Sequence, residues 1–589
     1  MSGLLNEIWN RATQRIPMSR SVHSPSPILI VGGGPTGLTL AIELARRDVP
    51  FRLVDRRSGP STTSRSFTLH ARTLELFEQA GYAHRFVERG IPDSSMDIRF
   101  EGVDDVTQLD FTQLISCYAY FLVIEQNVTE AVLRNQLSAV VRERGGTGGQ
   151  IEWNTRLGSL TEDSSGRMVA SLVHVDDGDH VEAAHFDWVV GCDGLHSTVR
   201  TECGLTFDGD EYKGSMRMVD APLEGFSLSG TSTHYLTGKD HMALIVKLPG
   251  RNYRVLLSND DGIGSDRSDV PAAAIRRELQ LAIDQHFHGN VRIGEPEWAT
   301  RFPIWHRISS GFGARIGQGR AFVVGDAAHI HSPAGGQGMN ACIQDAFNLG
   351  WKLALVAKGI APESLLDTYE LERRPIAEQV IAGTDRLHQI ILAHGEDIEG
   401  RRNKAHAAGF NLSAVQQISG VAYTYRDPAV AATGLAAGDR APDVVLGHGL
   451  RLHELFRHSD YTLLILQRGA RTEATAAIEA AAHRYAGALR TVVITQTPPR
   501  EALNATVIAE TNDVFDLYGI PDDDSLCLIR PDGYIRFRSG FGGAHMMFAV
   551  LSSVLRGLSR AVKPATLGAR SKPATDRGPS ATRAGISGE

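Results

Sequence analysis

Cysteine is scarce in this chain. The five residues are scattered, odd in number and free of any C-x-x-C pair, which argues against a disulfide framework or a zinc ribbon. They are Cys117, Cys192, Cys203, Cys342 and Cys527. The pair His329 and His331 has no cysteine or carboxylate donor beside it in the sequence, so we expect no metal site there. A reducing cytoplasm is the expected location.

Long apolar runs and an excess of basic charge are also missing. No stretch reaches the ~20 apolar residues that cross a bilayer, and residues 1–24 lack the apolar core of a secretory signal, so we expect a flexible extension there. The 60 lysines and arginines are outnumbered by 68 aspartates and glutamates, and both signs are mixed along the chain. This balance indicates no surface for nucleic acid. We expect a folded protein that neither spans a membrane nor binds nucleic acid.

The first motif that is present reads ILIVGGGPTGLTLA, followed by PFRLVD. It predicts a strand, a glycine turn, a helix and a second strand, which is one βαβ unit of a doubly wound sheet. The glycines permit the turn, a close approach to a pyrophosphate and tight helix–strand packing, while Asp55 can accept ribose hydroxyls. The motif predicts a dinucleotide but does not choose between FAD and NAD. The expected binding residues are Gly32, Gly34, Pro35, Thr36, Gly37, Asp55 and Arg56.

Two more apolar strands end in acidic turns. Residues 186–191 lead into Asp193-Gly194, and residues 321–325 lead into Gly325-Asp326. Because the three turns lie far apart in the sequence, we expect inserted segments between them. Residues 206–305 carry alternating runs such as HMALIVKL and YRVLLS, which favour an antiparallel sheet.

A new pattern begins after a helical region near residues 340–395 and a linker over residues 401–440. Residues 441–560 predict a βαβαββα module that resembles a thioredoxin-like domain. It lacks the dithiol of redox thioredoxins, since Cys527 stands alone. We therefore favour a structural or dimerising role, in a homodimer, over disulfide chemistry. Residues 561–589 have no apolar periodicity and are expected to be disordered.

Together, the three turns resemble those of the group A flavin monooxygenases, the FAD-dependent aromatic hydroxylases. The likeness spans residues 25–560 and is strongest for the phenol-hydroxylase-like branch, through segments such as HIHSPAGGQGMNACIQDAFNLGWK and LLDTYELERRPIAEQ. It implies an α/β fold with a doubly wound, Rossmann-like FAD-binding domain over residues 25–205 and 306–400. An antiparallel substrate-binding sheet over residues 206–305 would be inserted, with substrate-facing segments near 85–125 and a thioredoxin-like domain at the C-terminus.

The resemblance also implies roles for individual residues. Asp326 would hold the ribityl chain of FAD, and the helix N-terminus at Gly338 would face the flavin ring, where its positive end stabilises reduced flavin. Asp193 matches a turn that serves both FAD and NAD(P)H without a second dinucleotide fold. Taken alone, a surface salt bridge is favoured for Arg65 and a helix-start hydrogen bond for Gln126; within the set of motifs, the ligand role is favoured for both. The implied cofactor-binding residues are Arg65, Gln126, Asp193, Gly194, Arg200, Gly325, Asp326, Gly338, Met339 and Asn340.

The activity implied by the resemblance is aromatic hydroxylation. NADPH or NADH would reduce FAD, O2 would add to the flavin, and the C4a-hydroperoxide would transfer OH to a phenol, including one with a ring halogen or nitro group to displace. Alternatives are a larger phenolic or polyketide-type substrate, an FAD-dependent dehydrogenase or oxidase, and a flavin-binding assembly protein. Ordinary packing or a salt bridge is the competing interpretation for Tyr235, Arg254 and Tyr425. The implied substrate-site residues are Tyr235, Arg254, Pro333 and Tyr425.

Overall fold

The computed structural model describes residues 28–555, apart from residues 63 and 240 and the segments 145–148, 228–229, 260–269, 393–397, 401–402, 404–411, 430–433, 447–448, 470–471, 498–505, 510–512 and 521–523. The predicted extension over residues 1–24 and the predicted tail over 561–589 lie outside the described residues. No helix in the described part is long and apolar enough to cross a membrane.

A six-stranded sheet forms the centre of the molecule, in the order β20-β21-β12-β1-β2-β8. All neighbours are parallel except the edge strand β20. The four residues of β1 are all buried, as expected for a strand covered on both faces. The strands are β1 (Ile28–Val31), β2 (Phe51–Val54), β8 (Ile151–Glu152), β12 (Trp188–Gly191), β20 (Gly313–Ile316) and β21 (Gly319–Val323).

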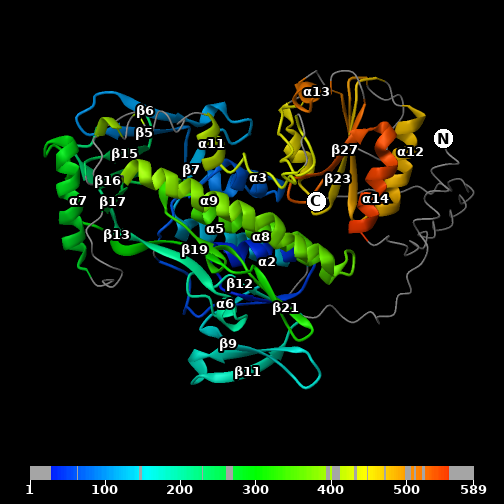
Figure 1. The fold of residues 1–589 in the computed structure, drawn as a ribbon, viewed down its shortest axis with the longest axis horizontal. Helices are drawn as coiled ribbons and strands as arrows, with labels where there is room; N and C mark the ends of the chain where they lie inside the picture. Colours follow the sequence, from blue (N-terminus) through cyan, green and yellow to red (C-terminus); the bar gives the residue numbers. More distant parts are fainter. Residues whose placement is uncertain are drawn as a thin grey trace, which may run out of the picture.

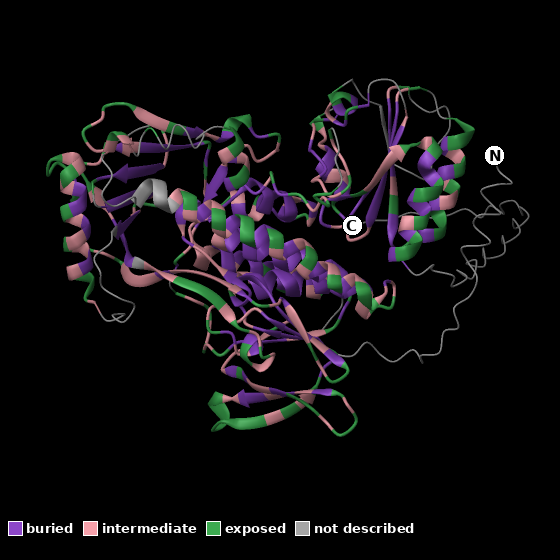
Figure 2. Cartoon of the chain, in the orientation of Figure 1, coloured by how far each residue is buried: buried purple, intermediate pink, exposed green. Residues whose placement is uncertain are grey.

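Helices pack around this sheet (Figure 1). Helix α8 contacts α2, and α5 contacts α2. Figure 2 shows the helices at the centre of the molecule as largely buried, and 17 residues of α8 are buried. The helices are α2 (Pro35–Ala45), α5 (Gln126–Glu143), α6 (Thr198–Glu202), α8 (Gly338–Ala357) and α9 (Thr368–Leu392).

An eight-stranded sheet lies beside the first, in the order β22-β19-β13-β17-β16-β15-β5-β6. One face packs on helix α7 (Ala272–Phe287) through an apolar cluster. The sheet is antiparallel except where β5 pairs with β15 in parallel. Strands β5 and β6 come from the expected insertion near residues 85–125, so the sheet recruits strands from outside 206–305. The strands are β5 (Ser95–Phe100), β6 (Val106–Asp110), β13 (Phe207–Ala221), β15 (Thr233–Thr237), β16 (His241–Lys247), β17 (Tyr253–Asn259), β19 (Trp298–Ser309) and β22 (His329–Ile330).

Two three-stranded sheets were not predicted. One, in the order β11-β10-β9, projects from the lower side of the molecule in Figure 1. Its outer strand has no buried residue and therefore lacks the apolar signal of a core strand. The other has the order β3-β7-β4, and β4 and β7 flank strands β5 and β6 in the sequence. The strands are β9 (Thr155–Glu162), β10 (Met168–His174), β11 (His180–His185), β3 (Thr68–Leu69), β4 (Ile91–Asp93) and β7 (Phe121–Val123).

The described residues from 441 to 555 form what we call the C-terminal unit. Its five-stranded sheet has the order β25-β24-β23-β26-β27, with β23, β24 and β25 parallel and β26 and β27 antiparallel. Apolar clusters cover this sheet, and one includes Trp351 of α8, which packs the unit against the rest of the chain. The elements are β23 (Tyr461–Gln467), α12 (Glu473–Ala482), β24 (Leu489–Thr495), β25 (Thr506–Ala509), α13 (Asp513–Leu517), β26 (Ser525–Ile529), β27 (Ile535–Gly540) and α14 (Ala544–Val554).

Candidate active site

The three predicted turns meet at one end of the parallel sheet. Gly32 has a φ of +107°, and a Cβ there would lie 2.3 Å from the carbonyl oxygen of Cys192, beside the second turn. Gly325 in the third turn has a φ of +64°, and a Cβ there would lie 3.0 Å from Thr36 Oγ1 in the first. Only glycine permits both the left-handed backbone and these approaches. Three segments that are remote in sequence therefore build one surface.

Two helix N-termini accompany these turns. Helix α2 begins at Pro35 and helix α8 at Gly338, and no side-chain hydrogen bond caps either helix. A Cβ at Gly34 would meet no atom within 4 Å, so the backbone before α2 borders open space. Free N–H groups at a helix N-terminus attract anions and other electron-rich groups. Both helix N-termini therefore carry backbone N–H groups that no side chain caps.

Asp55 lies at the end of β2, where the motif predicts it. Its Oδ2 accepts a 2.7 Å hydrogen bond from the backbone N–H of Gly33, and it pairs with Arg57 Nη2 at 2.9 Å. The side chain of Arg56 is exposed. Arg57, and not Arg56, therefore contacts the carboxylate. The sequence motif could not choose between these two adjacent arginines, because only the folded structure shows which one lies close to Asp55.

Asp193 and Arg200 lie at and after the second turn, and the side chains of both are engaged by protein groups. The carboxylate of Asp193 accepts hydrogen bonds from Ser197 Oγ at 2.6 Å and from the backbone N–H of Thr198 at 2.7 Å, at the start of α6. Burial raises the pKa of Asp193. Arg200 donates to the carbonyl oxygen of Ala327 at 2.8 Å, beside the Gly325-Asp326 turn. Arg200 therefore links the two turns, whereas Asp193 braces the second turn against the start of α6. Gly194 supplies a left-handed φ of +79° in the second turn.

Asp326 is exposed at its tip, yet desolvation by the surrounding protein raises the pKa of its carboxyl. The carboxylate is therefore accessible to solvent while protein groups surround it. The thiol of Cys342 donates to it at 3.2 Å. The positive charge of Arg65 favours the ionised form, and the guanidinium of Arg65 lies 5.3 Å from the ring centre of Phe302. A carboxylate in this position can accept hydrogen bonds from a hydroxylated chain.

Gln126 begins helix α5 and makes local contacts. Its Oε1 accepts from the N–H of Ser66 at 3.3 Å, and its Nε2 donates to Glu130 at 3.2 Å. This is the arrangement of the helix-start alternative. It brings Gln126 next to the segment that carries Arg65, but its amide is already engaged by protein groups.

The loop from Pro333 to Gly336 is held from several sides. His70, at the start of helix α3 (Ala71–Gln79), hydrogen bonds through Nε2 to the carbonyl oxygen of Gly335 at 2.9 Å, and Asn340 Oδ1 accepts from the N–H of His70 at 2.8 Å. Burial raises the pKa of Tyr235 to about 12, opposed by a hydrogen bond with the backbone of Gly335. Tyr235 thus reaches the loop that carries Pro333. His70 was not predicted, because a single histidine before a helix carries no sequence signal.

Arg254 and Tyr425 occupy positions that fit the competing interpretation. Arg254 is 0% exposed, and its Nε and Nη2 each lie 2.7 Å from an oxygen of Asp220. Its guanidinium is therefore committed to a buried salt bridge. The hydroxyl of Tyr425 accepts from Arg373 of α9 at 3.1 Å and from Asn348 of α8 at 3.2 Å, so its described hydrogen bonds are to these helices and not to the Pro333 loop. The neighbouring Tyr423, which was not predicted, donates at 3.0 Å to Gln337, the residue that directly follows that loop.

We expect His70 to make the protein sensitive to acid. Burial lowers the pKa of His70 from 6.5 to about 4. Because the unfolded chain takes up the proton first, the contribution of His70 is fully present above pH 6.5 and is lost as the pH falls toward 4. The difference in pKa corresponds to about 3 kcal/mol of unfolding free energy. Urea unfolding of the wild type and of His70→Gln between pH 7 and 4 should show a smaller loss in the variant.

The exposed His84 provides the matched control for this experiment. His84→Gln should keep the pH dependence of the wild type. Equal pH slopes for His70→Gln and the wild type would contradict the assignment.

Comparison with known proteins gives one family match and relatives that align over most of the chain. A family model described as an FAD binding domain matches residues 26–384. Pentachlorophenol 4-monooxygenase from Sphingobium chlorophenolicum is 35% identical over 542 residues, covering 90% of this chain and 96% of the relative. 6-Methylpretetramide 4-monooxygenase from Streptomyces rimosus is 32% identical, covering 95% and 98%.

A solved structure extends the comparison to the fold. Aklavinone-11 hydroxylase, in a ternary complex with FAD and aklavinone, superposes with a TM-score of 0.70 at 26% identity, covering 91% of this chain and all of that one. The mixed α/β architecture is therefore that of FAD-dependent aromatic hydroxylases. The family match and the length of the alignments confirm the resemblance found in the sequence. The chain belongs to the FAD binding domain family and, within it, to the flavoprotein aromatic monooxygenases.

Proposed function

We propose that the chain uses NAD(P)H and O2 to hydroxylate a substituted phenol. The observation that carries this proposal is the surface where three glycine turns meet, with Asp326 at its base and the Pro333 loop beside it. The pentachlorophenol 4-monooxygenase relative supports the substrate class. One oxygen atom would enter the ring and the other would leave as water, with two electrons from NAD(P)H.

The residues of this surface fit FAD. The open backbone at Gly34 and the free N-terminus of α2 would take the pyrophosphate. Asp55 would accept from the ribose and Asp326 from the ribityl chain, while the N-terminus of α8 would face the ring. Bound FAD supplies the redox and oxygen chemistry, and the protein supplies orientation and electrostatics.

An apolar wall on the eight-stranded sheet would receive the aromatic substrate. It is built on the face opposite α7 and includes Tyr235 together with Phe111, Phe121, Met216, Met218 and Leu256. Such a wall excludes water, which protects a reactive oxygen species from side reactions. Tyr235 and Pro333 would meet the substrate at the flavin side. Arg254, paired with Asp220, would position the wall rather than carry a free charge to the phenol.

A larger substrate is the second candidate. The 6-methylpretetramide and aklavinone enzymes act on polycyclic aromatic compounds by name, and both align along almost the whole chain. The eight-stranded sheet and the segment over residues 85–125 would form the binding site for a substrate of either size. The size of the ring system is therefore the property to test. Displacement of a halogen or nitro group would release halide or nitrite and leave a quinone in place of a diol.

A substrate screen tests the function. Purified protein loaded with FAD is mixed with NADH or NADPH and with a series of phenols, halophenols, nitrophenols and polycyclic phenols. A substrate should stimulate NAD(P)H consumption by roughly tenfold or more and should yield a product with one atom from 18O2. Halide or nitrite release identifies displacement. Reduction of FAD by substrate without NAD(P)H would indicate a dehydrogenase or oxidase, and peroxide as the sole product for every compound would contradict the hydroxylase proposal.

We further propose that the C-terminal unit is a thioredoxin-like domain with a structural or dimerising role. The order of its five strands and its flanking helices support this fold. Cys527 is buried on β26, and desolvation raises the pKa of its thiol, which opposes thiol chemistry there. Sedimentation of the full chain would test the homodimer.

A further inference from the structure

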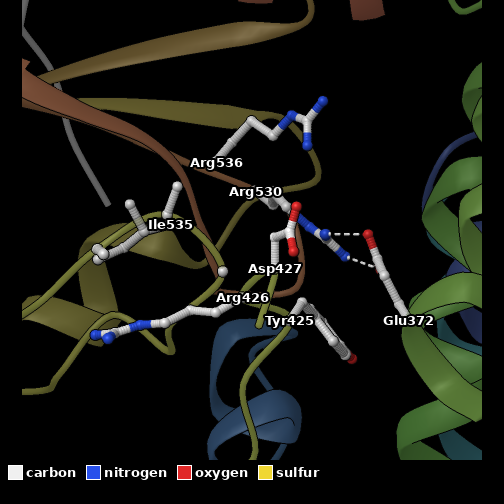
Figure 3. Close-up of a pocket in the computed structure, with 10 residues that line it drawn as sticks. Glu372, Tyr425, Arg426, Asp427, Arg530, Ile535 and Arg536 are labelled. Carbon is white, nitrogen blue, oxygen red and sulfur yellow. Dashed lines mark hydrogen bonds and ion pairs between the residues drawn. The ribbon is translucent and has the colours of Figure 1, made fainter. Parts of the chain in front are cut away.

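A buried series of hydrogen-bonded polar side chains starts in the C-terminal unit. Arg530 holds both oxygens of Glu372 on α9, at 2.6 and 2.8 Å (Figure 3). It also holds both oxygens of Asp532, at 2.9 and 2.6 Å. Asp532 in turn accepts from the indole N–H of Trp351 on α8 at 3.1 Å. The boundary between the C-terminal unit and the helices is therefore closed by paired charges, next to a cavity of about 270 Å³.

This series of polar side chains continues along α8 and α9 toward the proposed flavin site. Asn348 donates from one amide nitrogen to Glu372 at 2.7 Å and to the hydroxyl of Tyr425 at 3.2 Å. Arg373 donates to the same hydroxyl at 3.1 Å and to Asp345 Oδ1 at 2.5 Å. The Tyr425 hydroxyl thus accepts from both Asn348 and Arg373, and it joins the part of the series next to the C-terminal unit to the part that leads to Asp345.

The far end of this series of side chains reaches the third turn. Asp345 Oδ2 accepts from the backbone N–H of Gly325 at 3.3 Å and pairs with His329 Nε2 at 2.7 Å. Gly325 directly precedes Asp326. A continuous series of contacts therefore links Arg530 of the C-terminal unit to the turn that presents the Asp326 carboxylate.

Burial makes this series stiff. Asp345 and Arg373 are 0% and 1% exposed. Charged groups that are desolvated keep their partners, because breaking one pair strands the other group without compensation. The attraction of Arg530 and Lys352 lowers the pKa of Glu372 despite its burial. Arg373 and His329 likewise lower the pKa of Asp345 against desolvation. Both carboxylates are therefore ionised, and both ends of the series are held by charge.

We propose that Tyr425, Arg373 and Asp345 are positioning residues that link the boundary of the C-terminal unit to the Gly325-Asp326 turn and thereby raise the affinity for FAD. The inference rests on the proposed role of Asp326 toward FAD. It gives Tyr425 a function in place of the substrate contact expected from the sequence. Its hydroxyl carries the link, while its ring packs on Tyr534 of the C-terminal unit at 4.1 Å between ring centres.

Tyr425→Phe in the full chain tests this proposal. The substitution keeps the ring and removes the acceptor of Arg373 and Asn348, so we expect FAD affinity to fall roughly tenfold, as for a buried donor left unpaired. Fluorescence titration of FAD into the FAD-free protein measures it. The control is Arg536→Ala, an exposed side chain at the same cavity, which should bind FAD as the wild type does.

A double-mutant cycle separates positioning from general destabilisation. In an Asp345→Asn background, the effect of Tyr425→Phe on FAD affinity should largely disappear, because the route to Gly325 is already cut. Additive effects, or wild-type affinity in Tyr425→Phe, would overturn the proposal. Failure of the wild type to bind FAD would instead refute the proposed function, and loss of FAD in Asp326→Ala with normal binding in Tyr425→Phe would refute only this inference.

Discussion

Asp326→Ala is expected to weaken FAD binding by roughly 10- to 150-fold, which is the value of one charge-assisted hydrogen bond of about 1.5–3 kcal/mol. Asp326 is exposed in the third turn, and its proposed partner is a hydroxyl of the ribityl chain. Titration of FAD into the FAD-free variant measures the effect. The ultraviolet–visible spectrum of the purified variant should show a lower flavin content.

The same substitution should not harm the FAD-free fold. Desolvation raises the pKa of Asp326, so its charge opposes folding when FAD is absent. Thermal unfolding of FAD-free Asp326→Ala should therefore occur at the wild-type temperature or above it. Glu297→Ala is the control, because Glu297 pairs with Arg251 at the surface and such pairs contribute little. Unchanged FAD affinity in Asp326→Ala would remove Asp326 from the site.

Gly37→Ala is expected to disrupt the nucleotide-binding fold itself. A Cβ at Gly37 would lie 1.9 Å from the carbonyl oxygen of Gly32, so helix α2 would have to move away from the turn after β1. Overpacking against backbone costs about 3 kcal/mol or more. We expect a lower unfolding temperature and little retained FAD. Circular dichroism during heating, with and without FAD, measures both.

Gly34→Ala is the matched variant. It stands in the same motif with a φ of −77°, and its Cβ would meet no atom within 4 Å in the FAD-free chain. Alanine should keep or slightly raise the stability of the FAD-free protein by restricting the unfolded chain. The methyl group would instead crowd the pyrophosphate and weaken FAD binding. Equal behaviour of the two variants in both measurements would argue against a ligand in front of Gly34.

The local parts of the site could be predicted from the sequence. Gly32, Gly34, Gly37 and Asp55 belong to one βαβ unit, where a strand, a turn and a helix follow each other directly. The turns at Asp193 and Asp326 could be predicted because each follows a buried apolar strand. Family resemblance then joined the turns, which periodicity alone cannot do.

The remaining parts depend on partners that are remote in the chain. Arg254 pairs with Asp220, 34 residues away, and Arg530 pairs with Glu372, 158 residues away. A charged residue shows no preference in sequence for one partner among many. The parallel pairing of β5 with β15 was missed for a similar reason, since a strand that joins a sheet from another insertion carries the same alternating pattern as its neighbours.

The strand order of the central sheet has a consequence for synthesis of the protein. Strand β12 lies between β1 and β21, and β21 begins only at Gly319. A nascent chain that has emerged as far as β12 therefore exposes one side of an apolar strand until more than a hundred further residues follow. Ribosome-bound intermediates of this length should engage chaperones, and slow translation before Gly319 would lengthen that exposure.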